Sequence, residues 1–399
     1  MFFARNSQMI HTDSIQSILL RLPNWLGDSV MVSPAFEWLK LSFKNADFTL
    51  VGTEASCGIY QRDKRVKHIV IDTTKRSSCR IQATKRLAKE VGAHDLAISF
   101  ANTFFSALLL YWTKSNIRIG YAKNLRSFLL THALSLKQNT STTFKHQVLL
   151  YLGLILPLQG VQNELEKKEL QRQESQKQSL KNLTNMLATL GSQPLKLISQ
   201  SISLPHNKYA IGINPGAAFG SAKCWEREYF IEVIEYFLGK MYDVYLFGSS
   251  DTSNSHLAIA QAIAGHTYAK HFYDLTDKTN LTQLIDYIGA MNVFITNDSG
   301  PMHIAAALKV PMVAIFGPTD MNETAPYIPL NPPVSNNQAQ PAKAYKDFVL
   351  LCKHVPCAPC KKRECPLKHH NCMKLITPAE VITQVDNLLN YHKGNNYDT

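Results

Sequence analysis

Short apolar runs that end in Gly, Pro, Asn or Asp alternate along the chain with longer segments of helical period. This alternation is typical of βα units that build parallel sheets. The runs predict strands at 17–22, 48–52, 68–71, 96–100, 117–120, 209–214, 243–247, 293–296 and 312–316. In the second half, helices are expected to begin near Trp225, Asn254, Asn280 and Pro301, and a last helix is expected at 378–389.

A polar segment at about 162–200 separates the two groups of strands. It is rich in Gln, Lys, Glu, Asn and Ser, and we expect a solvated helix and linker there. The simplest architecture is α/β, with two doubly wound (Rossmann-like) domains that face a central cleft. The predicted domains span 1–195 and 205–375, followed by a C-terminal helix and tail at 376–399.

The composition is that of a folded protein with an anionic partner. The chain has 399 residues, of which 45% are hydrophobic and 18% are charged, so it can bury two cores and disorder is excluded as the default. Lys and Arg exceed Asp and Glu by 42 to 30, a net charge of +12. Such an excess favours phosphate, nucleic acid or a membrane surface as partner.

Neither a secretion signal nor a membrane span is expected. Polar residues follow Met1-Phe2-Phe3 before any apolar run of signal-peptide length. The most apolar stretches, at 104–112 and 148–158, are shorter than the roughly 20 residues that a span requires. We therefore expect a cytoplasmic protein that can touch a membrane surface.

Ligands of open parallel sheets bind beyond the carboxyl ends of the strands, so the loops there hold the candidate chemistry. The loop after the first strand reads Arg-Leu-Pro-Asn-Trp-Leu-Gly-Asp-Ser at 21–29. Gly27 permits a tight turn, and Asp28 with Ser29 suits the start of a helix, where a carboxylate accepts from free amide N–H groups. Taken alone, this loop favours a helix cap as the role of Asp28.

The loop at 214–225 follows the first strand of the second half. Its small residues, among them Gly216 and Ala217, allow a phosphate to come close, and Lys223 supplies a mobile positive charge. The spacing is not that of a Walker A motif. A plain glycine-rich turn is an equal alternative for this motif by itself.

A third loop ends the strand before Pro301. It reads Asn-Asp-Ser-Gly, and Pro301 suits the first position of a helix, so unpaired N–H groups and the positive helix end form a candidate anion site at Asp298, Ser299 and Gly300. Taken alone, His303 on this helix is more often a core histidine than a ligand-binding one.

The three loops, in this order and at these separations, resemble those of glycosyltransferase family 9. The cysteine-rich stretch Cys-Ala-Pro-Cys-Lys-Lys-Arg-Glu-Cys-Pro further resembles the heptosyltransferase II branch, and the likeness extends over about 17–389. The resemblance implies a GT-B fold and inverting transfer of L-glycero-D-manno-heptose from ADP-heptose to the heptose of the lipopolysaccharide inner core. The N-terminal domain would hold the acceptor, Kdo-lipid A carrying a first heptose, and the C-terminal domain the donor.

The resemblance also implies roles for individual residues. Asp28 would be the general base, and Lys223 would contact the diphosphate. The remaining donor-binding residues would be Gly216, Ala217, Asp298, Ser299, Gly300 and His303. After the Phe-Gly-Ser strand end at 247–249, only Asp251 is at hand for a ribose or heptose contact. The enzyme would work on the anionic inner face of the inner membrane, with no nucleic acid as partner.

Neither a metal nor another cofactor is expected for transfer. The sequence has no Asp-x-Asp pair, so a helix dipole and Lys223 would take the place of a diphosphate-clamping cation. Cys357, Cys360, Cys365 and Cys372 have a spacing that allows a zinc site, with His354, His369 and His370 nearby. Reduced thiols or a local disulfide would also fold this loop, and we favour a structural role without metal.

Three other functions are open. Another family 9 heptosyltransferase or a GT-B-like nucleotide-sugar epimerase would use similar loops. A nucleic-acid-binding protein would use the net charge and the cysteine cluster, but it leaves the three loops without a purpose. Ten Lys and Arg residues at 62–89 are expected to form a basic patch for lipid headgroups or acceptor phosphates, with an ordinary solvated face as the alternative.

Overall fold

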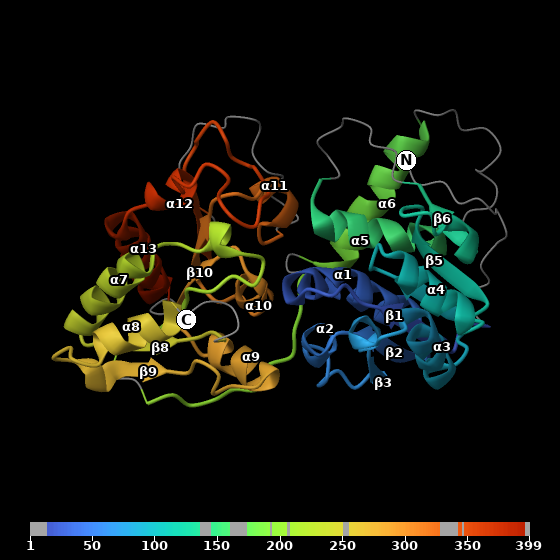
Figure 1. The fold of residues 1–399 in the computed structure, drawn as a ribbon, viewed down its shortest axis with the longest axis horizontal. Coiled ribbons are helices and arrows are strands. Elements are labelled where there is room, and N and C mark those ends of the chain that lie inside the picture. The colour runs from blue at the N-terminus through green and yellow to red at the C-terminus, as the bar shows by residue number, and fades with distance from the viewer. Residues whose placement is uncertain are drawn as a thin grey trace. The chain divides into compact units, whose positions relative to one another are not determined.

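The computed structural model describes residues 14–135, 145–159, 174–191, 194–205, 208–249, 255–327, 342–344 and 347–395. The described residues up to Ile198 form one compact unit, and those from Ser199 onward form a second (Figure 1). Each unit is built on one sheet with helices packed against it. Within the described residues, no helix is both long and apolar enough to cross a membrane.

The sheet of the first unit is entirely parallel, with strand order β3-β2-β1-β4-β5-β6. This is the order of a Rossmann sheet. Its strands are β1 (Ser17–Arg21), β2 (Asp47–Gly52), β3 (Val66–Ile71), β4 (Leu96–Ser99), β5 (Ile117–Tyr121) and β6 (His132–Leu134). Helices cover both faces of such a sheet, so its central strands are apolar throughout rather than alternating. In β1, Ile18, Leu19 and Leu20 are all fully buried.

The helices of the first unit are α1 (Leu26–Ser42), α2 (Glu54–Gly58), α3 (Arg80–Val91), α4 (Phe104–Trp112), α5 (Gln147–Ile155) and α6 (Glu174–Leu190). Helix α6 occupies part of the segment expected to be a solvated helix and linker. That expectation is wrong for its second half, because Leu183, Met186 and Leu190 are buried and α6 packs on α1. The three residues recur at helical spacing, which gives α6 one apolar face within a polar sequence.

The sheet of the second unit repeats the same order, with one additional strand. Its order is β12-β13-β11-β10-β7-β8-β9, and all pairings are parallel except that of β12 with β13. The strands are β7 (Ala210–Asn214), β8 (Asp243–Leu246), β9 (Phe272–Asp274), β10 (Val293–Asn297), β11 (Met312–Phe316), β12 (Ala342–Ala344) and β13 (Phe348–Cys352).

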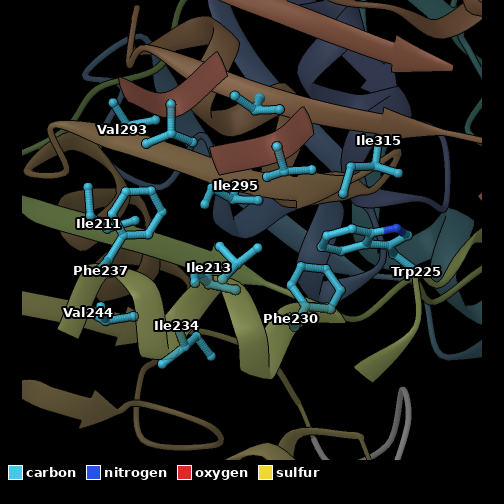
Figure 2. Close-up of a cluster of buried hydrophobic side chains, with 14 of the residues drawn as sticks. Ile211, Ile213, Trp225, Phe230, Ile234, Phe237, Val244, Val293, Ile295 and Ile315 are labelled. Carbon is cyan, nitrogen blue, oxygen red and sulfur yellow. The ribbon is translucent and has the colours of Figure 1, made fainter. Parts of the chain in front are cut away.

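The core of the second unit lies between this sheet and its helices. Figure 2 shows Ile211 and Ile213 of β7 facing Phe230 and Phe237, and all four side chains are fully buried. At the edge of this cluster, Trp225 is buried and its indole N–H donates to the Ile376 carbonyl at 2.9 Å. The helices of this unit are α7 (Arg227–Gly239), α8 (Ser255–Ile263), α9 (Leu281–Gly289), α10 (Gly300–Ala307), α11 (Met321–Thr324), α12 (Asn371–Lys374) and α13 (Pro378–Asn395).

The predicted fold class is confirmed, and all nine predicted strands are present to within two residues of their expected bounds. Four strands were not predicted. Three of them, β6, β9 and β12, have only three residues each, and β12 makes the second sheet mixed rather than purely parallel. The fourth, β13, follows a long stretch without a strand pattern and pairs in parallel with β11.

Candidate functional site

Three loops meet at one edge of the second sheet because their strands are neighbours and run in parallel. Strands β11, β10 and β7 lie side by side, with Asn297 opposite Ile315 and Thr296 opposite Asn214. Their carboxyl ends therefore lie at the same level. The loops that follow hold all the predicted donor-binding residues except Gly300 and His303, which are on α10.

Two buried asparagines join the loops after β7 and β10. The side-chain amide of Asn214 donates to the Gly216 carbonyl at 3.1 Å and lies 3.3 Å from the Ser299 hydroxyl. Asn297 donates to the Pro215 carbonyl at 2.7 Å and accepts from the Trp225 backbone N–H at 3.2 Å. Because each asparagine bonds across two loops, the two turns are held in one fixed relation.

Lys223 and Asp298 form an ion pair at 2.6 Å between these two loops. The pair is nearly buried, with 12% of the Lys223 side chain and 4% of the Asp298 side chain exposed. Thr319, after β11, donates to the same carboxylate oxygen at 2.6 Å. Asp298 is thus engaged by two donors and holds the ammonium in place, while the three N–H bonds of an ammonium leave Lys223 able to donate elsewhere.

Helix α10 begins beside this pair. Its N-cap, Ser299, is in the extended region and makes no side-chain capping hydrogen bond, and Pro301 lies in the first turn as predicted. The uncapped first-turn N–H groups and the positive end of the helix therefore face the loop. Gly216 and Ala217 are buried, and His303 on α10 is only 3% exposed.

The cysteine-rich segment, residues 357–372, forms hydrogen bonds with the loop that holds Lys223 and with the loop after β11. The Ala222 N–H donates to the Arg363 carbonyl at 2.9 Å, and the Lys361 N–H donates to the Pro318 carbonyl at 2.8 Å. Gly220 has φ +153°, and a Cβ there would lie 2.3 Å from the Arg363 carbonyl oxygen. Only glycine fits this contact, so the spacing of two distant segments depends on it.

The four clustered cysteines line one small enclosed cavity of about 20 Å³, together with His369 and His370. Burial, and then the neighbouring charges of Cys357, Cys360 and Cys365, raise the pKa of Cys372 to about 11. None of the eight cysteines, all of which lie in the described residues, is in a disulfide. Among the residues that the structure describes, no three His, Cys, Asp or Glu side chains converge in a set that could hold a metal. The structural role of the cluster stays a prediction.

In the first unit, Asp28 lies in the first turn of α1 and is half-buried. Two local predictions are wrong here. Helix α1 begins at Leu26 with Trp25 as N-cap, so Asp28 is not the cap, and Gly27 lies within the helix rather than in a tight turn. An acidic residue in the first turn still interacts favourably with the helix dipole.

A buried arginine, which the sequence analysis missed, holds the loop before Asp28. Arg21 is 2% exposed at the end of β1 and donates to Asn24 at 2.9 Å and to Asp72 at 2.7 Å. Burial acts to raise the pKa of the Asp72 carboxyl, but the Arg21 guanidinium and hydrogen bonds from Thr74 outweigh it and lower that pKa. The signal in the sequence was a charged residue that ends an otherwise apolar strand.

Tyr151 of α5 is a close neighbour of Asp28. Burial, and after it the negative charge of Asp28, raise the pKa of Tyr151 well above its usual value. The phenol therefore keeps its proton at neutral pH. The Tyr60 hydroxyl donates to the Ser29 carbonyl at 2.6 Å and fixes the same turn from below.

Two other predicted features have different outcomes. Asp251 lies outside the described residues. In the basic stretch at 62–89, most cationic side chains are exposed, but Arg65 is partly buried and donates to the Phe43 and Ala46 carbonyls at 2.6 and 2.7 Å. Arg65 therefore supports the fold, and it is not part of a free basic patch.

Two doubly wound domains, each with polar side chains at the carboxyl edge of its sheet, define an enzyme of the GT-B class. The sequence at residues 84–370 matches the profile of glycosyltransferase family 9 (heptosyltransferase). The chain belongs to this family and is a glycosyltransferase.

Relatives of known name extend over nearly the whole chain. The chain is 34% identical over 373 residues to lipooligosaccharide heptosyltransferase 2 of Campylobacter jejuni subsp. jejuni serotype O:2, which covers 93% of this chain and 98% of that protein. It is 27% identical over 314 residues to lipopolysaccharide heptosyltransferase 2 of Salmonella typhimurium, covering 77% and 85%. The solved structure of E. coli ADP-heptose lps heptosyltransferase II superimposes with a TM-score of 0.66 at 22% identity, covering 95% of this chain and 100% of that one. This last likeness shows the fold.

Proposed function

We propose that this protein is a heptosyltransferase 2 of lipopolysaccharide core synthesis. It transfers L-glycero-D-manno-heptose from ADP-heptose to the heptose of the inner core, with inversion at the anomeric carbon. Membership of family 9 and the names of the full-length relatives support this assignment. The observation that carries it is the nearly buried Lys223–Asp298 pair beside the uncapped start of α10, which suits the diphosphate of a sugar nucleotide.

The second unit would bind the donor. Gly216 and Ala217 offer no bulk against a phosphate, the Ser299–Gly300 turn presents N–H groups, and Lys223 supplies the positive charge. Such fixed donors stabilise the diphosphate as it departs. Asp298 and Thr319 would position Lys223, and His303 would complete the donor-binding helix start. E. coli heptosyltransferase WaaC has been solved with ADP-2-deoxy-2-fluoro heptose, and its structure superimposes on this chain with a TM-score of 0.62.

The first unit would activate the acceptor. A hydroxyl that attacks the anomeric carbon must lose a proton, and Asp28 is the carboxylate that we assign to accept it. Asp28 must be ionised in order to act as a base. The positive end of the helix dipole at the start of α1 stabilises its carboxylate in this ionised form. Because attack comes from the face opposite the leaving diphosphate, a single displacement inverts the anomeric centre.

The acceptor would be Kdo-lipid A that carries a first heptose, at the inner face of the inner membrane. The net charge of +12 and the exposed lysines and arginines of the first unit suit its phosphates and the anionic bilayer. Since the sequence has no Asp-x-Asp pair, cationic side chains and N–H groups would do the work of a divalent cation.

Measurement of ADP release tests the proposal. With ADP-heptose, the protein is expected to release ADP only when Kdo-lipid A bearing one heptose is added. Cells that lack the protein are expected to make a core truncated after the first heptose, as read by mass spectrometry. Transfer to Kdo-lipid A without heptose would identify another family 9 heptosyltransferase. Conversion of ADP-heptose to an epimer without any acceptor would indicate an epimerase. Tight binding to a nucleic-acid duplex that ADP-heptose does not affect would indicate a nucleic-acid-binding protein.

A further inference from the structure

The turn that follows β5 presents large apolar side chains to solvent. Leu125 is 89% exposed and Phe128 is 71% exposed. Phe104, at the start of α4, is 37% exposed, and its ring centroid lies 6.4 Å from that of Phe128. Single exposed apolar residues are common on soluble proteins, but a contiguous group of this kind marks a contact surface. We call Phe104, Leu125 and Phe128 the apolar tip.

The apolar tip is held rigidly. Asn124 and Leu125 both have φ +53°, in the left-handed region, which costs about 1 kcal/mol or more for a residue with a side chain. The next residue, Arg126, is fully buried and donates to the Tyr121 carbonyl at 2.9 Å and to the Ala101 carbonyl at 2.5 Å. A buried cation that fastens two loops together thus keeps a leucine in a strained, exposed position.

The stretch of chain that carries the apolar tip has charged residues of one sign. Residues 96–163 contain six Lys and Arg and no Asp or Glu. Lys114 and Lys123 are exposed in this stretch, and the Arg118 guanidinium lies over the ring of Tyr111, which is 47% exposed. Exposed aromatic and apolar groups together with exposed cations are the composition of a surface that enters the headgroup region of an anionic bilayer.

The apolar tip follows the carboxyl ends of β4 and β5, at the edge of the first sheet where α1 with Asp28 begins. Strands β4 and β5 follow β1 in the sheet, so their carboxyl ends are on the same side (Figure 1). The Asn124 side chain donates to the Asn102 carbonyl, which links the two loops. Phe100, at the end of β4, packs its ring 5.6 Å from that of Tyr151, the neighbour of Asp28.

We propose that the apolar tip inserts into the boundary between headgroups and acyl chains of an anionic bilayer. This places the first unit against the lipid that carries the acceptor sugar, with Asp28 in the first turn of α1, which begins at the same edge of the sheet. Leu125 and Phe128 supply the apolar contact, and Lys114 and Lys123 supply the attraction to headgroup phosphates. The inference rests on the proposed lipid-linked acceptor, and it adds the surface that meets the membrane.

Flotation of the full chain with vesicles of phosphatidylglycerol and phosphatidylethanolamine tests this surface directly. The variant pair Leu125→Asn and Phe128→Ser removes the tip, and asparagine tolerates a left-handed backbone. The partition coefficient of the protein between vesicles and water is expected to fall at least tenfold, because burial of each of these side chains in the bilayer accounts for about a factor of ten in this coefficient. The matched control is Leu257→Ser, which removes a 54% exposed leucine of α8 and is expected to float like the wild type.

Equal partition of the tip variant and the wild type, or failure of the wild type to float, would overturn the inference. A wild type that is dimeric in solution beside a monomeric tip variant would overturn it too, by assigning the surface to a second copy. Unchanged thermal melting of the variant keeps the comparison valid.

An activity measurement separates this inference from the proposed function. For the lipid-linked acceptor in vesicles, the KM of the tip variant is expected to rise about tenfold or more. For the same acceptor oligosaccharide without its acyl chains, the KM is expected to be unchanged. An equal rise for both acceptors would contradict membrane insertion. If the wild type transfers heptose to neither acceptor, the proposed function fails, and the flotation result still decides the inference.

Discussion

Replacement of Asp28 with asparagine removes the proton acceptor and keeps the size and shape of the side chain. If Asp28 is the general base, turnover is expected to fall by roughly 10²–10⁴-fold, the usual contribution of positioned acid–base catalysis. Affinity for ADP-heptose is expected to stay nearly the same, because Lys223 and the α10 start belong to the other unit.

The structure sets the expected effect on stability. Trp25 is the N-cap of α1, so Asp28 does not cap this helix, and the substitution removes the interaction of a first-turn charge with the helix dipole. That interaction amounts to about 0.3–1 kcal/mol. For a domain of this size, the melting temperature is then expected to fall by roughly 1–4 °C.

Steady-state kinetics, donor binding by calorimetry and thermal melting of the variant are the measurements. Glu54→Gln is the matched control, because Glu54 is also an acid in the first turn of a helix, α2, and is exposed. The control is expected to lose a similar amount of stability and to keep full turnover. An Asp28→Asn enzyme with normal turnover would refute the role of Asp28 as base. A large loss of affinity for ADP-heptose would refute the assignment of donor binding to the second unit and of acceptor activation to the first.

Four other outcomes follow from the site. Lys223→Met is expected to lower the free energy of unfolding by about 3–5 kcal/mol, because it leaves the Asp298 carboxylate buried without its cation. Adding Asp298→Asn should restore the melting temperature but not the affinity for ADP-heptose. Recovered affinity would contradict the role of Lys223. The lowered pKa of Asp72 means that its pairing with Arg21 stabilises the fold above about pH 4 and is lost as pH falls through the lowered pKa; acid unfolding of Asp72→Asn should be less steep, and an unchanged profile would argue against the pair. Gly220→Ala is expected to lower the free energy of unfolding by about 1–3 kcal/mol, since the new Cβ meets the Arg363 carbonyl and the backbone has φ +153°. A melting temperature like that of the wild type would show that the loop shifts freely. Chelation with EDTA is expected to leave transfer intact, and activity restored only by Mg²⁺ or Mn²⁺ would count against this.

Much of the fold could be predicted because its signals are local. Strands β1, β7, β10 and β11 are short, continuous apolar runs between turn residues, which is what a strand buried on both faces requires. Strands of three residues carry too few positions to show a pattern, which is why β6, β9 and β12 escaped prediction. The buried face of α6 was missed because a polar composition concealed three apolar residues at helical spacing.

The sequence alone also pointed to the candidate residues, since a loop after a predicted strand is visible in one dimension. It determined that Lys223, Asp298 and Ser299 follow strands, and it did not determine which strands are neighbours. Strand order does, because β7, β10 and β11 are separated by many residues along the chain and adjacent in the sheet.

Contacts between distant segments were decided only by tertiary structure. The pairing of Lys223 with Asp298 and the close approach of Gly220 to the Arg363 carbonyl both depend on partners far away in sequence. Periodicity reports only which residues are apolar and how they repeat. Hydrogen bonds and ion pairs depend on distances of a few ångströms, and these exist only once the sheets have brought the loops together.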